Sequence, residues 1–62
     1  MNAQELTNKL NATASSGNLD KNNYADLVSQ AEGVTSFNSE EIFFENGSVV
    51  AWERGRGWSV YS

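Results

Sequence analysis

The feature that most constrains this 62-residue chain is the stretch FFENGSVVAWERGRGWSVY, residues 43–61, which places large apolar side chains on both strand parities. Asn46-Gly47 separates two apolar runs. This pair is the strongest short-range signal for a β-hairpin, because a two-residue type I′ turn needs positive φ at both central residues. A second reversal is expected over residues 54–57, Arg-Gly-Arg-Gly. The stretch therefore predicts a three-stranded antiparallel β-meander.

The first third of the sequence predicts a helix over residues 3–14. Asn2 is an N-cap residue and Glu5, three positions later, completes a capping box. Apolar residues then recur at the helical period and share one face. They are Ala3, Leu6, Leu10 and Ala14.

A second helix is expected to begin after Asp20, whose side chain is a strong N-cap. Leu19 and Tyr24 occupy the two positions of a hydrophobic staple. Gly33 then stands where a helix commonly ends in a C′ glycine, followed by Val34 at C″. The sequence predicts an α+β fold, with two N-terminal helices before the meander, in one small domain covering residues 1–62.

Strand register decides which side chains share a face. With a two-residue loop at Asn46-Gly47, Phe44 lies opposite Val49 and Phe43 opposite Val50. One predicted face carries Ile42, Phe44, Val49, Ala51, Trp58 and Val60. The other carries Phe43, Val50, Trp52 and Tyr61. We assign the first face to the core, because small Ala51 on the middle strand lets a helix approach.

Both predicted faces are apolar, whereas an antiparallel sheet with one solvated side normally alternates apolar and polar residues. Two short helices can cover one face of such a sheet, but they are too small to cover both faces. Phe43, Trp52 and Tyr61 are therefore predicted to form an exposed contact surface. Two alternatives stay open. A three-residue second loop would move Trp58 and Val60 to the other face, and a domain this small can use all of its rings in the core.

Composition removes several classes of function. The chain has no Cys and no His, which excludes disulfides, the usual zinc sites and nucleophiles of the Ser-His or Cys-His type. Acid pairs such as Glu40 and Glu53 are better explained as solvated strand ends than as a glycosidase dyad, given the small chain. We expect a non-enzymatic protein without cofactor or metal. With neither a signal peptide nor a membrane span, we expect it to be cytoplasmic.

Charge is distributed unevenly. The net charge is −4, but residues 22–53 contain six acids and no Lys or Arg. They are Asp26, Glu32, Glu40, Glu41, Glu45 and Glu53. This block makes nucleic acid an unlikely partner. It fits a basic protein partner, and it equally fits acids that only keep a small protein soluble.

The leading hypothesis is a small acidic protein-binding module. Its predicted contact residues are three aromatic and four acidic side chains, Phe43, Trp52, Tyr61, Glu40, Glu41, Glu45 and Glu53. In size and charge, the chain looks like small acidic accessory proteins of phages and mobile elements. That resemblance implies an inhibitor or adaptor covering a basic surface of a nucleic-acid-handling protein.

Two alternatives use the same region of the sequence. The first is a self-associating structural protein, such as a homodimer joined through the same rings. The second is single-stranded nucleic-acid binding through Arg54 and Arg56 beside Trp52 and Trp58.

Overall fold

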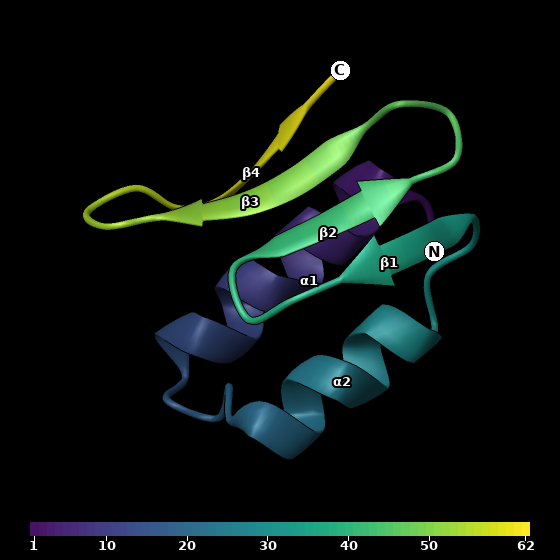
Figure 1. Cartoon of the computed structure of the whole chain (residues 1–62). Coiled ribbons are helices and arrows are strands. Elements are labelled where there is room, and N and C mark those ends of the chain that lie inside the picture. The colour runs from purple at the N-terminus through teal and green to yellow at the C-terminus, as the bar shows by residue number, and fades with distance from the viewer.

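The computed structural model describes residues 1–62, which form two helices followed by a four-stranded antiparallel sheet (Figure 1). The helices are α1 (Ala3–Ser15) and α2 (Lys21–Ser29). The strands are β1 (Val34–Phe37), β2 (Glu41–Phe44), β3 (Val49–Glu53) and β4 (Gly57–Tyr61), in the spatial order β1-β2-β3-β4. The α+β class is confirmed.

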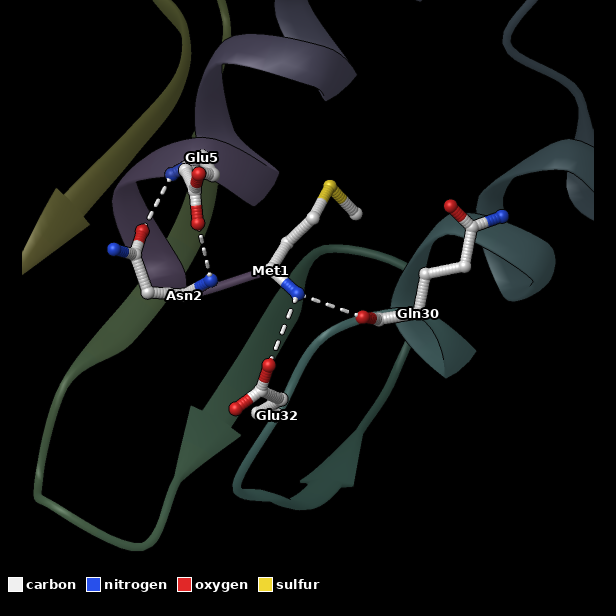
Figure 2. A network of polar contacts seen from close by, with 5 residues as sticks. All are labelled: Met1, Asn2, Glu5, Gln30 and Glu32. Atoms are coloured by element: carbon white, nitrogen blue, oxygen red, sulfur yellow. Dashed lines mark hydrogen bonds and ion pairs between the residues drawn. The ribbon is translucent and has the colours of Figure 1, made fainter.

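The predicted helix starts are confirmed by their caps. The Glu5 amide donates to Asn2 Oδ1 at 2.8 Å, and the Asn2 amide donates to Glu5 Oε1 at 2.9 Å, which completes the capping box (Figure 2). In α2 the Asn23 amide donates to Asp20 Oδ1 at 2.8 Å. Asn and Asp caps satisfy amides that have no partner within the helix.

Residues before α1 are tied to the connection that follows α2. The Met1 amino group donates to the Gln30 carbonyl at 2.9 Å and lies 3.8 Å from Glu32 Oε1 (Figure 2). The Glu32 amide donates to the Met1 carbonyl at 2.8 Å. These contacts hold the start of α1 beside the end of α2.

The predicted end of the second helix was wrong. α2 ends at Ser29 with Gln30 as its C-cap, so Gly33 is not the C′ residue. Gly33 has φ of +82° and leads directly into β1, where its carbonyl accepts from the Glu45 amide at 2.8 Å. Its positive φ serves the entry into the sheet rather than the helix end.

The three predicted strands are present as β2, β3 and β4, but residues 34–37 form a fourth, β1, which was not predicted. The turn between β1 and β2 contains no glycine. Asn38 Oδ1 accepts from the amides of Glu40 and Glu41, each at 2.9 Å, and the Asn38 amide donates to the Glu41 carbonyl at 2.8 Å. An Asn side chain that binds the following amides replaces the usual turn glycine.

The hairpin at Asn46-Gly47 exists, but its loop has three residues. The Gly47 amide donates to the Phe44 carbonyl at 3.0 Å, and the Phe44 amide donates to the Ser48 carbonyl at 2.9 Å. Gly47 has φ of +90°, whereas no residue other than glycine has positive φ, which rules out the type I′ turn. Phe43 therefore pairs with Val49 rather than Val50.

This longer loop reverses the faces of β3. Val50 pairs with Ile42 and with Val60, and all three lie on the helix side of the sheet. Ala51 pairs with Glu41 on the opposite side, so its assignment to the core was wrong. The second loop also has three residues, 54–56, rather than the expected 54–57. Its shift cancels that of the first loop, so Trp58 and Val60 stay on the helix side and the predicted faces of β2 and β4 are confirmed.

The core lies between the two helices and one face of the sheet. Its nine buried apolar residues come from both helices and from three strands, so both helices cover the same face (Figure 1). They are Leu6, Leu10, Tyr24, Leu27, Val28, Ile42, Phe44, Val50 and Trp58.

Helix α1 also protects the outer edge of β4. Asn11 Nδ2 donates to the Trp58 carbonyl, and Asn11 Oδ1 accepts from the Trp58 amide, both at 2.9 Å. The Asn11 amide thus occupies the place of a neighbouring strand at this position. A capped edge pairs less readily with other chains.

Candidate binding surfaces

No helix or strand covers the second face of the sheet, which we call the open sheet face. At one end of this face lies a row of three apolar residues from adjacent strands, Phe43, Val49 and Tyr61, which are direct cross-strand partners. Tyr61 is 45% exposed. Glu41, Ala51 and Ser59 form the next row along the strands.

The open sheet face carries carboxylates and no cation within its strands. None of the four strands contains Lys or Arg. The Tyr61 hydroxyl donates to Glu53 Oε1, and this hydrogen bond to a carboxylate raises the pKa of Tyr61. Arg56, at the β3–β4 turn, lies 3.8 Å from Glu53 Oε2. The face is therefore apolar along one row and acidic beside it.

A second surface lies at the end of the core layer, between the α1–α2 loop and the β1–β2 turn. It consists of a hollow of about 640 Å³, lined by Leu19, Tyr24, Phe37 and Trp58, and a neighbouring hollow of about 460 Å³ that reaches Trp52. The two hollows share Leu19, Ser39 and Trp58. We call this surface the aromatic groove.

Packed rings form the inner wall of the aromatic groove. Tyr24 stacks on Trp58 with ring centres 5.3 Å apart, and Phe37 meets Tyr24 edge-on at 6.0 Å. The Tyr24 hydroxyl donates to the Asn38 carbonyl at 2.6 Å, while burial raises the pKa of Tyr24 to about 12. The hydroxyl thus remains protonated and holds α2 to the β1–β2 turn.

The predicted contact residues divide between these two surfaces. Phe43, Tyr61, Glu41 and Glu53 lie on the open sheet face. Trp52 is 42% exposed but lies on the helix side, opposite Trp58, and it lines the aromatic groove with Glu40. The predicted grouping of Trp52 with Phe43 and Tyr61 on one face was wrong.

Glu45 belongs to neither surface. It lies beside Gly33 at the far end of the β1–β2 pair, where a Cβ on Gly33 would lie 3.4 Å from Glu45 Cγ.

Sequence reasoning did not identify the aromatic groove. Phe37, which lies in a segment for which no strand was predicted, is 48% exposed at the groove wall. One signal was present, since the predicted staple brings Leu19 beside Tyr24. Its extension to Phe37 depends on β1, whose four residues, Val-Thr-Ser-Phe, do not alternate apolar and polar side chains as a half-buried strand does.

No group of three or more His, Cys, Asp or Glu side chains could hold a metal ion. Every buried side-chain nitrogen and oxygen atom has a hydrogen-bond partner. Neither helix has the length and apolar character that crossing a membrane requires.

Comparisons with known proteins give no relative: no family model, no curated protein and no solved structure matches the chain.

Proposed function

We propose that this protein is a non-enzymatic binding module whose open sheet face docks on a basic surface of another protein. The observation that carries the proposal is the one-sided placement of the helices, which leaves the row Phe43, Val49 and Tyr61 without a covering layer (Figure 1). Apolar patches bordered by polar groups are typical of protein contact sites.

Charge selects the class of partner. Glu41 lies one row along the strands from the apolar row and Glu53 one row further, and of the two only Glu53 has a cation nearby, Arg56 of the β3–β4 turn. A partner with Lys or Arg around an apolar patch gains attraction and a faster association rate. Proteins that handle nucleic acids carry such basic surfaces, so an inhibitor or adaptor that covers one is the specific form of the proposal.

The test is capture of a partner from extracts of the native host by the immobilised protein. Tyr61→Ser removes the most exposed ring of the open sheet face, and Trp52→Ser is its matched control on the opposite side. We expect a basic protein to be retained by the wild type and the control, lost with Tyr61→Ser, and released by added salt. Equal capture by all three proteins would reject the open sheet face as the site.

The two other hypotheses predict different results. Self-association through the open sheet face would bring Glu41 and Glu53 of two copies together, which like-charge repulsion disfavours. Sedimentation is expected to give a monomer, and a dimer that Tyr61→Ser dissociates would favour the homodimer. Nucleic-acid stacking on Trp58 is opposed by its burial, since only 6% of this residue is exposed.

A further inference from the structure

We propose that the aromatic groove is a second, independent binding site, which accepts an apolar or aromatic side chain flanked by basic residues in a peptide segment of a partner protein. The groove lies on the helix side of the sheet, so the proposal does not depend on the open sheet face.

Exposure of the groove rings is the first argument. The three large apolar residues with the greatest exposure are Phe37, Trp52 and Tyr61, and the first two line the groove. A marginally stable domain of this size would gain by burying these rings. Their position around a hollow of about 640 Å³ matches the usual size of ligand sites, roughly 300–1,000 Å³.

Hydrogen bonding limits what the inner wall can recognise. The Tyr24 hydroxyl is already used by the Asn38 carbonyl, and no buried side-chain polar atom in the protein lacks a partner. A ligand group placed against Tyr24 and Trp58 therefore meets mainly ring surface, on which the Tyr24 hydroxyl is already engaged as a donor. Such a wall selects an apolar or aromatic side chain, because a polar one would lose its hydrogen bonds to water.

The charges along the groove indicate what must flank that side chain. Asp20 lines the larger hollow and Glu40 the smaller one, while Lys21 is the single cation among the lining residues. Two carboxylates beside an aromatic wall attract Lys or Arg, which can also lie over ring faces. The two connected hollows suit a short extended segment rather than one compact molecule.

Three capped peptides test this assignment, Arg-Phe-Arg, Glu-Phe-Glu and Arg-Ala-Arg, each titrated into ¹⁵N-labelled protein. Arg-Phe-Arg is expected to shift the indole N–H signals of Trp52 and Trp58. The peptides without the ring or with acidic flanks should bind at least about fivefold more weakly, because each lacks one of the two contacts. Shifts confined to Phe43 and Tyr61, or absent for all three peptides, would overturn the assignment.

Three variants locate the contact without depending on a single fold-sensitive residue. Phe37→Ser should weaken Arg-Phe-Arg binding about tenfold. Asp20→Asn keeps an N-cap and Glu40→Gln keeps the side-chain shape, so each removes one charge and should cost about two- to fivefold. Tyr61→Ser is the control and should bind Arg-Phe-Arg as the wild type does. If both charge variants bind with unchanged affinity, the basic flanks are not recognised and the proposal fails.

Discussion

Tyr24 connects three parts of the molecule through a single side chain. Its ring stacks on Trp58 in β4 and meets Phe37 in β1, and its hydroxyl donates to the Asn38 carbonyl. The protonated form is favoured by burial, which raises the pKa of Tyr24 from 10.0 to about 12. Ionisation of this hydroxyl would place a charge in the core and remove its hydrogen bond.

Stability is therefore expected to fall in alkali. The folded state keeps the Tyr24 proton to higher pH than the unfolded state, so the stabilisation is complete below pH 10 and is lost as the pH rises toward 12. Ionisation of Tyr24 is expected to lower the free energy of unfolding by about 2–3 kcal/mol. Urea titrations from pH 8 to 12 should show it, and Tyr24→Phe should remove this part of the slope. An identical slope in the variant would contradict the assignment.

Gly57 is needed at the first position of β4 for two reasons. Its φ is +77°, and a Cβ there would lie 2.9 Å from Asn11 Oδ1, which caps the edge of β4. Gly17 has the same φ, but nothing lies within 4 Å of its Cβ position. An alanine at Gly17 would therefore cause backbone strain alone, whereas an alanine at Gly57 would cause the same strain and a steric conflict with Asn11.

We expect Gly57→Ala to lower the free energy of unfolding more than Gly17→Ala. Gly17→Ala should cost about 1 kcal/mol from backbone strain alone. Gly57→Ala should cost about 1–3 kcal/mol more, because it also displaces Asn11 from the backbone groups of Trp58. Chemical denaturation measures both values, and equal losses would show that the Asn11 contact contributes little.

At the scale of elements, the register of β3 decides which residues are core and which are surface. Local sequence predicted a turn at Asn46-Gly47 correctly, but not whether its loop has two residues or three. A shift of one position reverses every side chain of a strand. For this reason Val50, predicted on the exposed face, is fully buried in the structure, and Val49, predicted in the core, lies on the open sheet face.

A pair of valine substitutions tests that register. Val50→Ala removes two methyl groups from a fully buried site and should lower the free energy of unfolding by about 2 kcal/mol. Val49→Ala changes the same groups on the open sheet face and should cost less than about 1 kcal/mol. Denaturation midpoints give the comparison. A larger loss for Val49→Ala would support the register that the sequence predicted.

At the scale of the whole molecule, few residues are buried. Only 10 of the 62 residues are buried, and a core of this kind rarely provides more than about 3–5 kcal/mol. One large truncation can therefore exceed the whole stability. The two tryptophans provide the clearest contrast, since they are direct partners on the same face but differ in exposure.

Trp58→Ala is expected to unfold the protein, because a Trp→Ala change at a buried site costs about 3–5 kcal/mol. Trp52→Ala should keep the far-ultraviolet circular dichroism spectrum of the wild type, with a lower melting temperature, because 42% of this residue is already exposed. Loss of structure in Trp52→Ala would show that this ring belongs to the core and would remove it from the aromatic groove.

The predicted faces of β2 and β4 agree with the structure, that of β4 because the errors in two loop lengths cancel. The sequence by itself determined both helix starts and the positions of the two glycine-containing hairpins. Each depends on contacts between residues a few positions apart, as in the capping box of Asn2 and Glu5. Tertiary structure decided the rest. β1 forms because Val34 and Phe37 pair with β2 and adjoin the core, although residues 34–39 are mostly polar.

The predicted site also differs from the observed surfaces because part of it depends on tertiary packing. The acidic block and the apolar row of Phe43 and Tyr61 were readable from composition and strand parity. The face on which Trp52 lies was not readable, because it depends on whether the Asn46-Gly47 turn has a two-residue or a three-residue loop, and the local sequence is compatible with both. Packing resolves that choice, since only the three-residue loop buries Val50 between Ile42 and Val60 against the helices.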